Sequence, residues 1–86
     1  MDKLWSDDAW DDYLYWQNQD RKTLKRINEL LKDIDRNGPA DGLGKAERLR
    51  YLGAYSRRID DKNRLVYTID ERGKLVILSC RGHYED

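Results

Sequence analysis

The spacing of apolar residues changes at a glycine-rich loop in the middle of the chain, and this change constrains the fold most. Before the loop, in residues 20–37, apolar side chains recur every three or four positions, as on one face of a helix. After it, in residues 48–80, they mostly alternate with polar side chains, as in half-buried strands. The loop, residues 38–44, holds three glycines and the only proline. The order of the two periods predicts helices first and a sheet afterwards.

Two helices are expected in the N-terminal half. Ser6 can cap the first helix, which is expected to end near Gln19. Asp20 can cap the second, and the Asn-Gly-Pro sequence at residues 37–39 stops it, since proline cannot continue a helix. The core face of the second helix is expected to consist of Leu24, Ile27, Leu30, Leu31 and Ile34.

Strands are expected at residues 3–5, 48–51, 55–59 and 64–69, each with alternating or short apolar patterns. The nearly continuous apolar run Lys74–Cys80 fits a central strand that is covered on both sides. The predicted fold class is therefore α+β: a small twisted antiparallel sheet with two N-terminal helices packed on one face.

Length and composition narrow the possible functions. Eighty-six residues leave room for one core, so residues 1–86 are expected to form a single domain. One cysteine and one histidine exclude a disulfide framework and nearly all metal centres, so no metal or cofactor is expected. No signal peptide and no apolar run of membrane-spanning length is present, which predicts a cytoplasmic protein without a membrane partner.

Charge is unevenly distributed along a chain that is neutral overall. Residues 44–86 carry ten Lys and Arg against seven Asp and Glu, while residues 1–43 carry seven against ten. A polarised small domain can present one basic face to a phosphate backbone. The same composition also fits a solvated surface with uneven charges.

The connection at residues 60–62 decides whether two arginines meet. A three-residue connection pairs Ile59 with Asn63 and brings Arg58 opposite Arg64, whereas two or four residues would separate them. Guanidinium groups grip phosphate through paired N–H donors, so such a pair suits phosphoryl-transfer chemistry. Alternatively, the charges protect an edge strand from aggregation.

Candidate acid–base groups complete this basic half. His83 is the only imidazole, and its ordinary pKa of about 6.5 suits proton transfer at neutral pH. Tyr84 beside it can stack on a base, and the cations around Glu47 favour its ionised form. Each also has an interpretation without a catalytic role. His83 can be a surface histidine, Tyr84 part of a frayed terminus, and Glu47 a member of a surface ion pair. Further candidates for phosphate binding are Lys45, Arg48, Arg50, Arg57 and Arg81.

Seven segments together carry a family resemblance. They are residues 4–6 (LWS), 10–17 (WDDYLYWQ), 25–33 (KRINELLKD), 56–59 (SRRI), 64–67 (RLVY), 80–81 (CR) and 83–84 (HY). In these segments the chain resembles the YoeB branch of the RelE-type toxins of bacterial toxin–antitoxin modules. The Trp-Asp-Asp-Tyr block and the His-Tyr pair are specific to that branch.

The resemblance implies a metal-independent endoribonuclease that cleaves messenger RNA in the ribosomal A site and inhibits translation. Glu47 matches the family's general base and His83 its general acid, while Tyr84 completes the site. Arg58 and Arg64 match its phosphate-binding arginines. The base would take the proton of a ribose 2′-hydroxyl and the acid would protonate the departing 5′-oxygen. The products would be a 2′,3′-cyclic phosphate and a 5′-hydroxyl.

The resemblance also implies a homodimer and a YefM-type antitoxin as partners, besides the ribosome and its messenger. Arg50 stands where a lysine is usual in the family. The chain departs from the family pattern in three further ways: Gly82 replaces an aromatic residue, Glu85-Asp86 follow the His-Tyr pair, and the loop between the helices and the sheet is one residue longer. Two alternatives stay open: a non-catalytic binder of the ParE type, and a degenerate toxin that binds without cleaving.

Overall fold

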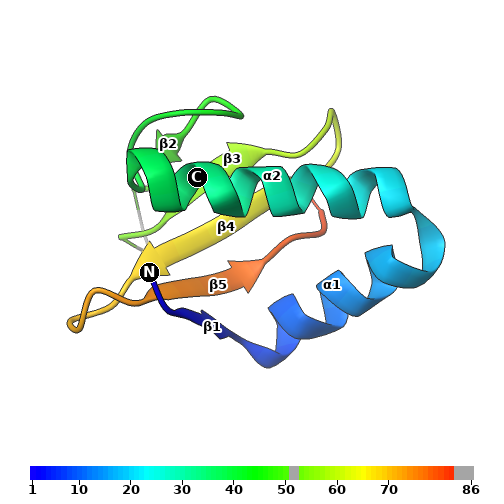
Figure 1. Cartoon of the computed structure of the whole chain (residues 1–86), viewed down its shortest axis with the longest axis horizontal. Coiled ribbons are helices and arrows are strands. Elements are labelled where there is room, and N and C mark those ends of the chain that lie inside the picture. Colours follow the sequence, from blue (N-terminus) through cyan, green and yellow to red (C-terminus); the bar gives the residue numbers. More distant parts are fainter. Residues whose placement is uncertain (51–52, 83–86) are drawn as a thin grey trace.

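The computed structural model describes residues 1–50 and 53–82, and these contain two helices and five strands (Figure 1). The elements follow one another as β1 (Lys3–Trp5), α1 (Asp7–Gln19), α2 (Arg21–Asn37), β2 (Glu47–Arg48), β3 (Tyr55–Arg58), β4 (Arg64–Ile69) and β5 (Leu75–Ser79). Figure 1 shows α2 lying across the sheet, with α1 beside the β1 and β5 end. The predicted α+β class with two N-terminal helices is confirmed.

Both helices begin and end where their capping residues predict. The Ser6 hydroxyl accepts a hydrogen bond from the Ala9 amide at 3.0 Å, and α1 ends at Gln19. The Asp20 carboxylate accepts the amides of Lys22 and Thr23 at the start of α2. Gly38 adopts a φ of +85° immediately after α2, a backbone conformation that favours glycine.

The five strands lie in the order β1-β5-β4-β3-β2. The pairs β5–β4, β4–β3 and β3–β2 are antiparallel, as predicted, but β1 runs parallel to β5, so the sheet is mixed. Along the chain, α1 and α2 lie between β1 and the other four strands, so β1 is not joined to its neighbour β5 by a hairpin. β5 is interior, flanked by β1 and β4, in agreement with its apolar run.

The main core lies between the helices and the sheet. It joins α2 to the middle strands through fully buried side chains such as Ile27, Ile34, Leu65 and Ile77. Leu24, expected on the core face of α2, is only half-buried, and Thr23 is more buried. The opposite face of the sheet carries a smaller cluster of Leu49, Ala54 and Val66, with Leu78 packed against it. This face without helices is where the candidate site lies.

Candidate active site

The hairpin register places two predicted arginines opposite each other. Ile59 donates its amide to the Asn63 carbonyl at 3.0 Å, and Arg58 pairs with Arg64. The three-residue connection was therefore the right alternative. Because directly paired residues point to the same side of a sheet, both arginines lie on the face opposite the helices. Glu47 pairs with Ser56 in the next strand pair, which brings it to the same face.

Arg64 is held at this face by two neighbours. Its Nε donates to the Ser56 hydroxyl at 3.1 Å, and its Nη2 lies 3.5 Å from a Glu47 carboxylate oxygen. The side chain is 15% exposed, and among residues 1–50 and 53–82 its Nη2 is buried and has no hydrogen-bond partner. A guanidinium nitrogen with a free N–H keeps the capacity to donate to an anionic oxygen.

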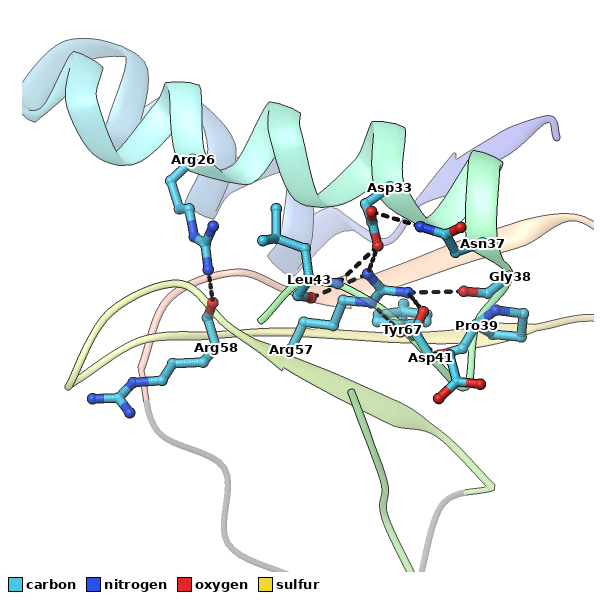
Figure 2. Close-up of polar contacts among 10 residues, drawn as sticks. All are labelled: Arg26, Asp33, Asn37, Gly38, Pro39, Asp41, Leu43, Arg57, Arg58 and Tyr67. Carbon is cyan, nitrogen blue, oxygen red and sulfur yellow. Dashed lines mark hydrogen bonds and ion pairs between the residues drawn. The ribbon is translucent and has the colours of Figure 1, made fainter. Parts of the chain in front are cut away.

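Glu47 and Arg58 are the more accessible members of this group. The Glu47 side chain is 61% exposed, so a solvent-borne substrate can reach its carboxylate. Arg58 is 43% exposed and forms an ion pair with Asp61 in the following turn. Its backbone carbonyl accepts a bond of 3.3 Å from Arg26 of α2, as Figure 2 shows. Arg58 is thus fixed at its backbone, and its charged end remains near the surface.

Ser56 is a site residue that the sequence prediction missed. It is fully buried, and its hydroxyl accepts the Arg64 Nε bond, which fixes the orientation of the guanidinium group. The signal was available in the hairpin register, because Ser56 lies on the same face as Arg58 and diagonally opposite Arg64.

The prediction that Arg57 binds RNA is wrong. Its side chain is 0% exposed, on the helix-covered side of the sheet. Figure 2 shows its guanidinium surrounded by α2 and the loop that follows. It forms an ion pair with Asp33, and Nε donates to the Tyr67 hydroxyl at 2.9 Å. The alternation of Tyr55, Arg57 and Ile59 had already assigned Arg57 to the apolar side, which is the physical reason for the correction.

The remaining cations of the prediction lie on the surface. All three cations around β2 are exposed: Lys45 before it, Arg48 within it and Arg50 just after it. Lys45 adopts a φ of +53°. Arg81 stacks over the ring of Tyr15 on α1, with its guanidinium carbon 3.5 Å from the ring centroid.

His83 and Tyr84 lie outside the described residues, but the segment before them is firmly held. Gly82, which precedes His83 in the sequence, donates its amide to the Asn63 side chain at 2.8 Å. Its carbonyl accepts the Arg64 amide at 3.0 Å. Cys80 is held from α1, since its amide donates to Asp12 and its carbonyl accepts the Trp16 indole N–H at 2.8 Å. The described part of the chain therefore ends at Gly82, which lies beside Arg64 at the start of β4.

The described residues offer neither a metal centre nor a membrane span. Between residues 1 and 50 and between 53 and 82, no three His, Cys, Asp or Glu side chains are grouped so that they could hold a metal ion. Within the same two ranges, neither helix is both long and apolar enough to cross a membrane.

Known proteins resemble this chain over nearly its whole length. Residues 5–84 match the family model described as the YoeB-like toxin of bacterial type II toxin–antitoxin systems. Toxin YoeB of Escherichia coli strain K12 is 48% identical over 86 residues, which cover 98% of this chain and 100% of the relative.

Solved structures agree with this match. The YoeB dimer from Staphylococcus aureus superposes with a TM-score of 0.90 at 49% identity, covering 98% of both chains. The heterotetrameric YoeB–YefM complex from the same organism gives a TM-score of 0.88 at 49% identity, again covering 98% of both chains. The sequence match, the full coverage and the shared fold establish that this chain belongs to the YoeB-like toxin family of bacterial type II toxin–antitoxin systems.

Proposed function

We propose that this toxin is an endoribonuclease that cleaves messenger RNA in the ribosomal A site and thereby inhibits translation in the bacterial cytoplasm. The observation that carries the proposal is the pair formed by Glu47 and Arg64 on the helix-free face. It combines an exposed carboxylate with a guanidinium nitrogen that has no hydrogen-bond acceptor within the described part of the chain. A base next to an anion-binding group is what attack on a phosphodiester requires.

Glu47 removes the proton of the ribose 2′-hydroxyl in this mechanism. The 2′-oxygen then attacks the adjacent phosphorus, and the bond from phosphorus to the 5′-oxygen breaks. Arg64, through Nη2, holds a non-bridging oxygen while negative charge accumulates, and Arg58 supports the same phosphate from the neighbouring strand. His83 returns a proton to the leaving 5′-oxygen, and Tyr84 stacks on a base. The products are a 2′,3′-cyclic phosphate and a 5′-hydroxyl, and no metal or cofactor is involved.

The surrounding cations extend the binding surface along the RNA backbone. Lys45, Arg48 and Arg50 lie beside Glu47 along the chain, and Arg81 follows β5. Contacts of this kind position a nucleic acid without reading its sequence, and they weaken as salt rises. The messenger and the ribosome that presents it are therefore the proposed substrate and partner.

The proposal includes two protein partners, a second copy of this chain and a YefM-type antitoxin. The support comes from relatives, since solved structures of S. aureus YoeB contain a dimer and a heterotetramer with YefM. Size-exclusion chromatography with light scattering, alone and with the cognate antitoxin, tests both partners.

A translating extract tests the catalytic proposal. Ribosome-bound messenger is analysed by primer extension after addition of wild type, Glu47→Gln, Arg64→Ala or His83→Gln. We expect each substitution to lower the cleavage rate by about two orders of magnitude or more. Glu71→Gln is the matched control, because Glu71 is also an exposed carboxylate but lies in the turn between β4 and β5.

Two results would contradict the proposed mechanism. Codon-linked cuts that persist at the wild-type rate in both Glu47→Gln and His83→Gln would exclude these residues as base and acid. Growth arrest by the wild type without any messenger cleavage would favour a non-catalytic binder, of the ParE type or a degenerate toxin.

A further inference from the structure

Arg57 uses every donor of its guanidinium group inside the protein. A guanidinium has five N–H donors, and Arg57 places them on five acceptors. They are the Tyr67 hydroxyl, the Asp33 carboxylate and the carbonyl oxygens of Gly38, Asp41 and Leu43. Three of these five acceptors are backbone atoms of one loop, residues 38–44, and Figure 2 shows them around the guanidinium.

Two neighbouring groups, the buried Tyr67 hydroxyl and the half-buried Asp33 carboxylate, hold the same loop. The Tyr67 hydroxyl accepts from Arg57 and donates to the Pro39 carbonyl at 2.6 Å. The Asp33 carboxylate accepts from Arg57 and also from the Leu43 amide at 2.9 Å. The loop that joins α2 to the sheet is therefore held by a polar cluster, which we call the Arg57 cluster: Asp33, Arg57 and Tyr67.

This loop leads directly to the proposed base. Gly44, the last residue of the loop, has a φ of +83°, and its carbonyl accepts the Arg58 amide at 2.7 Å. Glu47 begins β2 three residues later, and β2 is only two residues long. So short a strand at the edge of the sheet fixes the position of Glu47 weakly, and the preceding loop must supply the remaining restraint.

A buried arginine is a costly way to stabilise a loop. Burying a charged pair is often no better for stability than an apolar side chain of similar size, because desolvation opposes the attraction. The planar fork of a guanidinium, however, directs several bonds at fixed angles, which lysine or an apolar residue cannot do. The five hydrogen bonds of Arg57 therefore fix the geometry of loop 38–44. Glu47 lies three residues beyond the end of this loop.

We propose that Arg57, together with Tyr67, is a positioning residue for cleavage, which acts through loop 38–44 to hold Glu47 opposite Arg64. The inference rests on the proposed function, since it assigns a role relative to Glu47 as the base. It concerns residues that touch no RNA: the Arg57 cluster lies on the helix side, while substrate binds on the other face of the sheet.

The test compares two variants of the cluster with a control in the core. Tyr67→Phe removes one hydroxyl and no ring volume, and Arg57→Lys keeps the charge beside Asp33 but loses the fork. Ile27→Val is the control, because Ile27 is fully buried on the core face of α2 and removal of one methylene lowers stability without changing the loop. Cleavage of ribosome-bound messenger is measured for each well below its unfolding temperature.

We expect Tyr67→Phe and Arg57→Lys to lower kcat by about tenfold while KM changes less than twofold, since small misplacements of a reacting group are costly. Ile27→Val should leave kcat unchanged. In a Glu47→Gln background, Tyr67→Phe should have no further effect, because the group that it positions is already inactive. Hydrogen exchange supplies a measurement that does not depend on cleavage activity. The Leu43 amide should exchange faster in Tyr67→Phe than in Ile27→Val.

The outcomes separate this inference from the proposed function. If Glu47→Gln cleaves like wild type, Glu47 is not the base and the proposed mechanism fails at that residue, whatever the Arg57 cluster does. If Glu47→Gln is inactive but Tyr67→Phe and Arg57→Lys keep the kcat of Ile27→Val, the positioning role is excluded. A tenfold loss in Tyr67→Phe that is undiminished in the Glu47→Gln background would also overturn it, because the effect would not pass through Glu47.

Discussion

The Glu47 carboxylate lies 3.5 Å from Arg64 Nη2, a nitrogen to which no other described residue offers a hydrogen-bond acceptor. The ion pair therefore leaves a donor open at the place where a phosphate oxygen is proposed to bind. In the free protein the Glu47 carboxylate balances the positive charge of Arg64. The same carboxylate repels the phosphate that must approach Arg64. Binding and cleavage should consequently respond in opposite ways to loss of the Glu47 charge.

Glu47→Gln should bind RNA more tightly than wild type while it cleaves more slowly. Removal of one negative charge beside Arg64 should lower the Kd for a short RNA with a 2′-deoxy substitution at the scissile position by about two- to fivefold, since surface charge pairs contribute up to about 1 kcal/mol. Fluorescence anisotropy at fixed ionic strength measures this Kd. Arg64→Ala, as the comparison, should weaken binding; a weaker complex with Glu47→Gln would show that the carboxylate helps to hold RNA.

Asp61→Asn should release the Arg58 guanidinium for phosphate. Both side chains are substantially exposed, so their ion pair contributes about 0–1 kcal/mol, and RNA affinity should rise by no more than about fivefold. The same anisotropy titration in an Arg58→Ala background supplies the control. If Asp61→Asn tightens binding there as well, its effect does not depend on Arg58.

Asp33→Asn should destabilise the protein at neutral pH and lose this effect in acid. The hydrogen bond from Arg57, followed by the Leu43 amide, lowers the pKa of Asp33 below its ordinary value of about 3.9. A carboxyl group whose pKa is lower in the folded state than in the unfolded state stabilises the fold. This stabilisation is complete above the pKa of the unfolded state and is lost as the pH falls through the pKa of the folded state. Urea unfolding at pH 7 and pH 3 should give a difference between wild type and Asp33→Asn that narrows at pH 3. An equal difference at both pH values would contradict this linkage.

Cys80 should resist alkylation in the folded protein. Burial, and to a lesser extent the Asp12 carboxylate, raises the pKa of the thiol to about 12, so almost no thiolate exists at neutral pH. Iodoacetamide at pH 7.5 should label native protein on the timescale of global unfolding and label it rapidly in 6 M guanidinium chloride, as mass spectrometry can follow. Rapid labelling of the native protein would mean that the segment beside Trp16 opens easily.

Removal of Glu85-Asp86 should change the cleavage rate by less than twofold. These two carboxylates follow the His-Tyr pair in the sequence, where the family resemblance ends. Wild type and the shortened chain are compared in the translating extract at equal concentration. A gain of an order of magnitude would show that the two residues inhibit the site.

Local sequence signals predicted the local structure well. Ser6 and Asp20 identified both helix starts, because a capping oxygen satisfies amides only at that position. The three-residue connection gave the Arg58–Arg64 pairing, because the length of a turn determines the register of its hairpin. In contrast, three residues of β1 contain too little pattern to specify a partner that lies seventy residues away, so the parallel pair could not be predicted.

The error at Arg57 has a different origin. The charge of Arg57 predicts a surface position, whereas its neighbours Tyr55 and Ile59 predict that it lies on the apolar face. Charged residues are rarely buried unless they are paired, and the acceptors that pair with Arg57 come from loop carbonyls and Asp33, whose approach only the folded chain reveals. His83 and Tyr84 stay predictions from the sequence, because they lie outside the described residues.

The parallel pair of β1 and β5 also has a consequence in time. Lys3–Trp5 is synthesised before the other described strands, and its partner Leu75–Ser79 is synthesised after them. The β3–β4 hairpin and its extension into β5 need only nearby segments, whereas β1 must wait for a long-range contact with a high entropic cost. During synthesis, β1 therefore cannot pair with its neighbour in the sheet until β5 has been made.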